Sequence, residues 1–297
     1  MNNQAPYVST GAFKTRTVAE LVEWALKAGL DRIELSSGAA WSPDMLDRVR
    51  ETSGAPIHYL VHNYFPAPRT PFVLNLAASD VSSLAQSRAH CRGAVDLAAE
   101  LNAPMYSFHA GFAFSARPEQ LGKNLADAPR VSLNDAHAIF VESLKELCRY
   151  GEMKNVRIAV ENNVVAPFNL INGENKLLLC ATAEDMLKTY SDVGSSNLGF
   201  LVDTGHVKVS AKSLGFDVHA FLDQVKPHLI AFHLSDNDGL SDSNAPVDEQ
   251  SWFVPRLPEF PEAIIVLEAY SLEIDEIRAN CSLIEKARRT PGRPSTE

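Results

Sequence analysis

The sequence predicts a single α/β domain, a (β/α)8 TIM barrel over residues 1–289. Eight apolar runs of strand length alternate with helical segments along the 297 residues, and such alternation is typical of a parallel sheet. The runs are continuously apolar, as in strands that are buried on both faces. Eight strand–helix units fit a closed barrel, which usually needs about 250 residues. An open doubly wound sheet is disfavoured because no glycine-rich phosphate-binding turn follows any of the runs.

The expected strands are short apolar runs that stop at a polar residue or before a turn. In chain order they are residues 7–10, 32–36, 56–63, 104–109, 156–161, 200–203, 228–233 and 263–268. The sixth run ends in the carboxylate of Asp203, and a turn at Gly205 then presents His206.

Capping residues and the apolar period of a helix place the helices between these strands. Thr17 and Glu20 form a capping box that opens the first helix, and Gly29 ends it. The expected helices are residues 17–29, 42–52, 79–101, 132–150, a helix that begins at 182, then 217–225 and 274–287, with a weak helical segment before the last strand. Residues 290–297 have the composition of a disordered tail.

Composition and charge exclude several classes of function. The net charge of -10 argues against a large nucleic-acid interface, because phosphate binding needs clustered Lys and Arg. Four scattered cysteines without CxxC spacing suggest neither a disulfide framework nor a zinc ribbon. Without a signal-like N-terminus or an apolar run of about 20 residues, a soluble cytoplasmic protein without membrane contact is expected. The sequence is compatible with a monomer or a homo-oligomer.

Seven of the expected strands end in a residue that can bind a metal ion. In chain order these residues are Glu34, His62, His109, Glu161, Asp203, His233 and Glu268. Active sites of such barrels lie at the C-terminal ends of the strands, so these side chains should share one mouth. Several carboxylates in one mouth repel each other unless a cation neutralises them. The set Glu161, Asp203, His233 and Glu268 therefore favours a metal site.

Each residue also has a purely structural interpretation when it is taken singly. Asp203 could only cap the next helix, and Glu34 could equally hold a neighbouring group or a substrate. His62 and His109 would most often be hydrogen-bonded rim histidines. Asp236 belongs to a turn signature, although its place just after His233 also allows a substrate contact.

Five short motifs resemble those of the xylose isomerase-like barrels, a superfamily of sugar isomerases and epimerases related to D-tagatose 3-epimerase and endonuclease IV. They lie at residues 106–111, 160–162, 202–206, 233–239 and 267–268, so the resemblance covers nearly the whole chain. It implies a xylose isomerase-like TIM barrel with one divalent ion, Mn²⁺, Mg²⁺, Co²⁺ or Zn²⁺. The ion would be held by Glu161, Asp203, His233 and Glu268, and His206 would contact substrate.

The endonuclease branch of this superfamily carries three zinc ions and adds two histidines, which His62 and His109 match. Its third ion also needs an Asp-x-His motif after the seventh strand. Residues 248–250 read Asp-Glu-Gln instead, which argues against a trinuclear site. A site with one ion and a site with two ions both remain open. In a two-ion site, the second ion would be held by His62, His109 and a shared Glu161. In a one-ion site, the two histidines would bind substrate hydroxyls.

The favoured hypothesis is a metal-dependent sugar or polyol isomerase/epimerase that moves a proton through a metal-stabilised enediolate. Glu161 and Glu268 would be its two bases, with His206, Glu34 and Asp236 as substrate contacts. Epimerisation, 1,2-isomerisation and dehydration of a keto-cyclitol all remain open, as does a phosphate on the substrate. The alternatives are an endonuclease IV-like zinc phosphodiesterase acting on abasic DNA and a non-catalytic carbohydrate-binding barrel.

Overall fold

The computed structural model describes residues 5–289 except residues 16, 55–56, 121–122 and 126; the predicted tail at 290–297 lies outside them. Its centre is a closed barrel in which each strand pairs in parallel with the next and β8 pairs with β1. The strands are β1 (Tyr7–Ser9), β2 (Arg32–Leu35), β3 (His58–His62), β4 (Met105–His109), β5 (Arg157–Glu161), β6 (Leu198–Asp203), β7 (Leu229–Leu234) and β8 (Ile264–Leu267). The predicted (β/α)8 barrel is thus confirmed.

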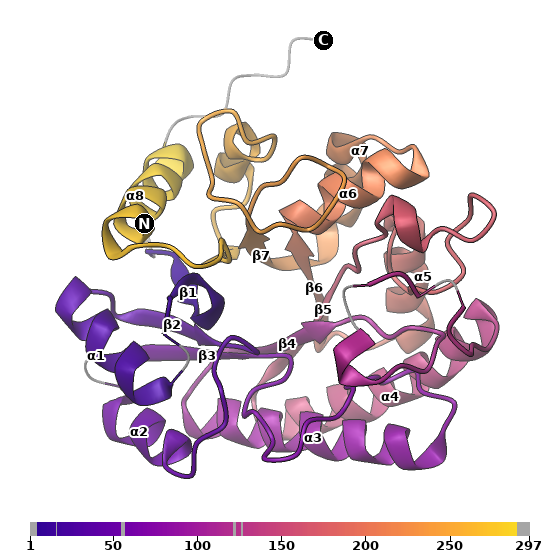
Figure 1. The fold of residues 1–297 in the computed structure, drawn as a ribbon, viewed down its shortest axis with the longest axis horizontal. Coiled ribbons are helices and arrows are strands. Elements are labelled where there is room, and N and C mark those ends of the chain that lie inside the picture. The colour runs from indigo at the N-terminus through magenta and orange to yellow at the C-terminus, as the bar shows by residue number, and fades with distance from the viewer. Residues whose placement is uncertain (1–4, 16, 55–56, 121–122, 126, 290–297) are drawn as a thin grey trace.

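The helices lie outside the strands and surround the barrel (Figure 1). They are α1 (Val18–Ala28), α2 (Met45–Thr52), α3 (Val81–Glu100), α4 (Leu133–Met153), α5 (Ala183–Val193), α6 (Thr204–Leu214), α7 (Val218–Val225) and α8 (Ile274–Arg289). Short 3-10 helices are η1 (Thr10–Ala12), η2 (Pro118–Gln120), η3 (Pro167–Asn169), η4 (Lys226–His228) and η5 (Val254–Glu259). None of the helices that the structure describes is long and apolar enough to cross a membrane.

Helix α6 is a helix whose bounds the sequence did not predict, although Asp203 was considered as the cap of a following helix. Its first turn contains Thr, Gly and Val, which are weak helix formers. The helix forms because both of its ends are capped: Asp203 accepts the backbone N–H of His206, and Gly215 adopts the left-handed conformation that ends a helix. The caps outweigh the poor intrinsic propensity of the first turn.

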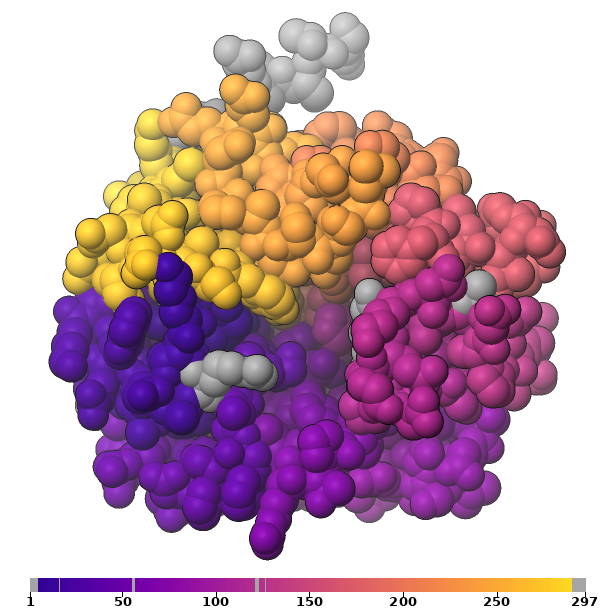
Figure 2. All heavy atoms as spheres, viewed as in Figure 1, coloured from indigo at the N-terminus to yellow at the C-terminus, as the bar shows by residue number. Residues whose placement is uncertain are grey.

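The strand register brings the polar strand ends to one level of the barrel. His109 pairs with Glu161 between β4 and β5, and Asp203 pairs with His233 between β6 and β7. Glu268 directly follows β8, and its backbone N–H donates to the Leu234 carbonyl at 3.0 Å. Figure 2 shows the face that carries the loops after the strands, hollowed near its centre.

Apolar side chains of the strands form much of the core, among them the fully buried Ile33, Leu60, Ile158 and Leu201. All four cysteines are free and buried.

Candidate metal centre

Four strand ends bring potential metal ligands together. Glu161 ends β5, Asp203 ends β6, His233 lies near the end of β7, and Glu268 follows β8. One donor atom from each of the four lies within 4.8 Å of the others. Glu161, Asp203 and His233 are completely buried, and Glu268 is 6% exposed. The set predicted from the sequence therefore meets at one point.

Several donor atoms of this cluster have no hydrogen-bond partner. Both carboxylate oxygens of Glu161, Oδ2 of Asp203 and Nδ1 of His233 are buried and unpartnered. Nδ1 of His233 lies 2.6 Å from Oε2 of Glu268, yet without the alignment of a hydrogen bond. Unpaired buried polar atoms are costly and rare in native proteins. Carboxylate oxygens and an imidazole nitrogen directed at a common point fit a divalent cation.

Asp203 caps a helix and belongs to the cluster at the same time. Its Oδ1 accepts the backbone N–H of His206 at 2.7 Å, which leaves Oδ2 free. Asn162 holds the Asp203 backbone from the side: its Oδ1 accepts the Asp203 N–H at 2.9 Å, and its amide donates to the Asp203 carbonyl at 3.2 Å. The cap and ligand interpretations of Asp203 are therefore compatible, because each uses a different oxygen.

Glu34 lies next to His233, on the opposite side of its ring from Glu268. Oε2 of Glu34 lies 3.0 Å from Nε2 of His233, and both side chains are fully buried. If Nε2 donates to this carboxylate, Nδ1 keeps its lone pair and can bind a metal ion. Glu34 thus orients an imidazole of the cluster.

A second group of donors shares Glu161 with the first. Oε2 of Glu161 lies 3.4 Å from Nε2 of His62 and 3.3 Å from Nδ1 of His109. Nδ1 of His62 is 2.9 Å from the Ser107 hydroxyl, which turns Nε2 toward Glu161. His62, His109 and Glu161 also satisfy the geometry of a metal-binding group, and so do Glu34, His62 and His233.

Burial and mutual charge shift the ionisation of the cluster. Burial raises the pKa of Glu34, raises that of Glu161 well above its ordinary value, and raises that of Asp203 to about 7. Burial also lowers the pKa of His109 to about 4 and that of His62 well below its usual range. Without a cation, the protein therefore disfavours the ionisation of all the carboxyl groups in the cluster together. A bound cation would favour this ionisation.

His233 and Glu268 behave in the opposite way. Burial opposes charge on both groups, but their attraction for each other outweighs it. The pKa of His233 is raised well above its usual value, and the pKa of Glu268 is lowered.

His206 lies at the edge of the cluster with both ring nitrogens engaged. Nδ1 is 2.9 Å from the Asn162 carbonyl oxygen and 3.3 Å from Oε1 of Glu161, while Nε2 is 3.1 Å from Oδ2 of Asp242. Burial alone would lower the pKa of His206, but Asp203, Asp242 and Glu161 raise it well above its usual value. Sequence reasoning found His206 but missed Asp242 and Asn162.

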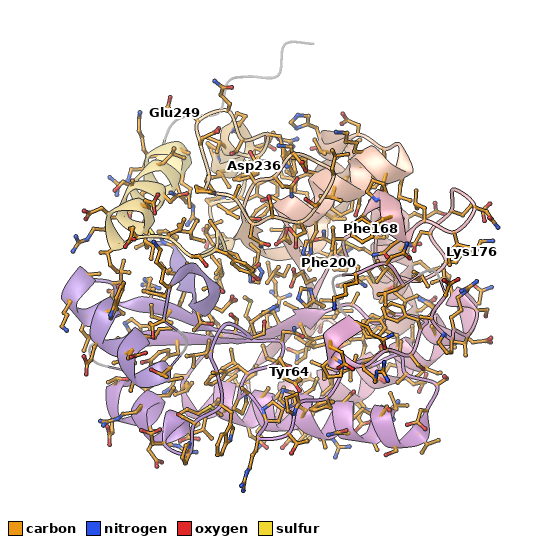
Figure 3. The ribbon with its side chains drawn as sticks, in the orientation of Figure 1. Tyr64, Phe168, Lys176, Phe200, Asp236 and Glu249 are labelled. Atoms are coloured by element: carbon orange, nitrogen blue, oxygen red, sulfur yellow. The ribbon has the colours of Figure 1, made fainter. Side chains whose placement is uncertain are left out.

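Asp236 has other partners than the cluster. It lies in the loop after β7 (Figure 3), where Oδ1 forms an ion pair with Lys208 at 2.5 Å and Oδ2 accepts the Ser251 hydroxyl at 2.8 Å. The Asp-Glu-Gln segment at residues 248–250 forms an exposed turn in which Asp248 accepts the Gln250 N–H at 2.7 Å. Both carboxylate oxygens of Asp236 thus have partners, on α6 and at Ser251, and its substrate contact stays a prediction.

Comparisons with known proteins agree with this architecture. The family model described as "Xylose isomerase-like TIM barrel" matches residues 22–268, which include every strand end from Glu34 to Glu268. A search of curated protein sequences finds no match.

Solved structures of similar fold include several sugar epimerases. A D-tagatose 3-epimerase-like protein is 18% identical over 96% of this chain and 97% of its own, with a TM-score of 0.72. The 3-keto-D-glucoside 4-epimerase of E. coli is 13% identical over 97% of this chain and 100% of its own, with a TM-score of 0.65. A Thermus thermophilus protein soaked with ZnCl2 is 18% identical over 94% of this chain and 98% of its own, with a TM-score of 0.62. At these identities the likeness shows the fold alone.

Proposed function

The chain belongs to the xylose isomerase-like TIM barrel family, and from this premise we propose that it is a divalent-metal-dependent isomerase or epimerase of a sugar or polyol. The observation that carries the proposal is the set of buried donor atoms without a hydrogen bond on Glu161, Asp203 and His233, joined by Glu268 within 4.8 Å. The fold neighbours named as sugar epimerases support the same chemistry.

We propose Glu161, Asp203, His233 and Glu268 as the residues that hold the metal ion. When bound, such an ion would neutralise the carboxylates and make the hydrogen next to a substrate carbonyl or hydroxyl more acidic. The mixture of oxygen and nitrogen donors suits Mn²⁺, Mg²⁺, Co²⁺ or Zn²⁺. Glu34 supports this role because it holds the ring of His233.

Glu161 and Glu268 are the proposed bases. They come from β5 and β8, which lie three strands apart in the barrel, so their carboxylates can approach a substrate from two sides. Oε1 of Glu268 is 3.5 Å from the hydroxyl of the half-exposed Tyr270, on the accessible side of the cluster. In this scheme one carboxylate removes a proton from a sugar carbon and the other returns a proton to the opposite face, as epimerisation requires.

Substrate contacts are proposed for His206, Glu34 and Asp236. His206 is the best supported of the three, because its Nε2 is directed at Asp242, a residue whose side chain is 26% exposed. Nε2 can therefore donate toward a substrate oxygen that enters from the same side. Glu34 is fully buried behind His233, so its contact with His233 is better supported than a direct contact with substrate.

Exchange of solvent hydrogen into a sugar tests the proposal most directly. Metal-loaded protein should incorporate deuterium from D2O next to the carbonyl of at least one ketose, and treatment with EDTA should abolish the incorporation. Re-addition of Mn²⁺ or Mg²⁺ should restore it. A ketose panel without any exchange in metal-loaded protein would contradict the isomerase proposal and favour a non-catalytic carbohydrate-binding barrel.

A second candidate is an endonuclease IV-like zinc phosphodiesterase. It is favoured by the group of His62, His109 and Glu161, which would hold an additional ion through Oε2 of Glu161. It is disfavoured by the net charge of -10 and by Gln250. Native mass spectrometry separates the candidates: three zinc ions per chain with cleavage of an abasic duplex would support the nuclease, and one or two ions with ketose exchange would support the isomerase.

A further inference from the structure

A cavity of about 430 Å³ lies at the other end of the barrel from the candidate metal centre, where the strands begin. Its lining includes the first residues of four strands, Met105 of β4, Arg157 of β5, Leu229 of β7 and Ile264 of β8, and the segment 259–263 that leads into β8. Arg157 and Glu161 are the first and last residues of β5, so about 13 Å of strand separates the two sites. The cavity is therefore distinct from the metal centre.

The walls of the cavity are largely apolar. Leu229, Ile230 and Ile264 line it and remain partly exposed, unlike the residues that follow them in β7 and β8. Side chains alternate between the two faces of a strand, so Arg157 points to the same side of β5 as Glu161, into the barrel. Ligand sites of this size usually combine apolar walls with a few polar groups. The cavity thus has the size and lining of a site for a small organic molecule.

Arg157 brings a positive charge to these walls. Its Nη2 donates to the Leu198 carbonyl at 3.5 Å, and among the described residues no carboxylate pairs with its guanidinium. Lys226, the other cation of the lining, is paired with Glu259 at 2.9 Å and lies over the Phe260 ring. Arg157 is therefore the cation of the lining that can take up an anionic ligand.

The two carboxylates of the lining, Glu259 and Glu262, are both faced by cations. Glu259 accepts from Nη2 of Arg256 at 3.0 Å in addition to its pairing with Lys226. Glu262 interacts electrostatically with Arg288, whose guanidinium donates to backbone carbonyls of the same segment. Once Arg256 and Arg288 are included, cations outnumber carboxylates around the cavity, which favours an anionic ligand over a cationic one.

We propose that this cavity binds a small monocarboxylic acid with an apolar chain, whose carboxylate pairs with Arg157. A guanidinium can donate two parallel hydrogen bonds to a carboxylate, and the walls formed by Leu229, Ile230 and Ile264 would cover the chain. One unpaired guanidinium matches a single negative charge, whereas a phosphate monoester would bring nearly two. The site does not depend on the proposed isomerase function, because no residue of the metal centre takes part in it.

Octanoate is a suitable probe for this site. Isothermal titration of the chain, freed of metal with EDTA and then dialysed, should show saturable binding of one octanoate per chain. Arg157 is exposed, so Arg157→Gln should fold, and it should weaken octanoate binding by about 10- to 100-fold, since hydrogen bonds to a charged partner are lost. 1-Octanol, which has the chain without the charge, should bind the unmodified protein more weakly by a similar factor. Arg149→Gln, at an exposed position of α4 outside the lining, is the control and should keep the affinity.

A second variant tests the place of the apolar chain. Ile264→Trp fills the cavity from β8 and leaves Arg157 in position, so it should abolish octanoate binding. Octanoate should raise the Tm of the unmodified protein and of Arg149→Gln, because a ligand of the folded state stabilises it, but not the Tm of Ile264→Trp. Absence of saturable binding, or equal affinity in Arg157→Gln or in folded Ile264→Trp, would overturn the proposal. Binding that requires added metal would place the carboxylate at the metal centre and would overturn it as well.

Discussion

Glu34 and His233, which are 199 positions apart in the chain, meet in the barrel with Oε2 and Nε2 at 3.0 Å. Because this contact engages Nε2, it leaves Nδ1 for the proposed metal ion. Glu34→Gln should therefore lower metal affinity by about 10- to 100-fold, since the neutral amide can no longer fix the ring in one tautomer. Isothermal titration with Mn²⁺ measures the change. Glu51→Gln, on the exposed face of α2, is the control, and equal affinities for the two variants would contradict the prediction.

The metal-free protein should lose stability as pH rises. The pKa of Asp203 is raised by burial from 3.8 to about 7, so the folded state binds this proton more tightly than the unfolded state. The corresponding stability is present below the unfolded pKa and is lost as pH rises through the folded value. A bound cation would neutralise the charge of the ionised Asp203 carboxylate and would compete with the proton for it.

Thermal unfolding with and without Mg²⁺ or Mn²⁺ measures this effect. The rise in Tm on metal addition should be larger at about pH 8 than at about pH 5. Asp203→Asn, which has no proton to lose, should weaken this pH dependence. A Tm increase that is the same at both pH values would show that ionisation of the cluster is not linked to metal binding.

Glu268→Gln and Glu161→Gln should act differently on exchange and on net conversion. If the two carboxylates serve opposite faces of the sugar, each variant should lose epimerisation by a factor of about 10² to 10⁴. Each epimer presents its C–H bond to one of the two carboxylates. The variant that keeps this carboxylate can still exchange the hydrogen of that epimer with solvent. Deuterium incorporation from each of the two epimers distinguishes these cases. Full exchange from both epimers in Glu268→Gln would contradict the two-base scheme.

The substrate should be unphosphorylated. The charged contacts of Glu34, Glu161, Asp203, Asp242 and Glu268 in the described residues are all with histidines. Lys208, on α6 nearby, is paired with Asp236. In the part of the chain that the structure describes, no ion pair joins an Arg or Lys to these five carboxylates, and like charges oppose the binding of a phosphate.

Paired substrates test this prediction. The kcat/KM of an active ketose should exceed that of its terminal phosphate by at least about tenfold, a difference of about 1.4 kcal/mol. Lys208→Gln should leave this ratio unchanged. A preference for the phosphate that disappears in Lys208→Gln would show that Lys208 leaves Asp236 and binds the anion.

The sequence was sufficient for the barrel and for the meeting of the polar strand-end side chains. Each strand lies within two residues of its predicted bounds, because buried parallel strands are continuous apolar runs that end abruptly. Barrel closure then brings Glu161 and Glu268 to the same mouth without further information. Asp242 could not be predicted in this way, because its contact with His206 depends on how residues 236–245 close on themselves. Helix α6 could have been found from its caps, Asp203 and Gly215, despite its weak first turn.

The capping role of Asp203 and its proposed role as a metal ligand can be separated by two substitutions. Asn is as good an N-cap as Asp, so Asp203→Asn should keep the hydrogen bond to the His206 N–H and the stability of α6 while it removes a charged ligand. Asp203→Ala removes both, and loss of the cap should cost about 1 kcal/mol more in the free energy of unfolding. Urea denaturation of the metal-free variants measures the cap, and Mn²⁺ titration of the folded variants measures the ligand. Both variants should bind Mn²⁺ much more weakly than the unmodified chain, whereas only Asp203→Ala should lose the cap energy. If Asp203→Asn kept full Mn²⁺ affinity, Asp203 would be a helix cap and not a metal ligand, because the hydrogen bond to Oδ1 would then be its sole role.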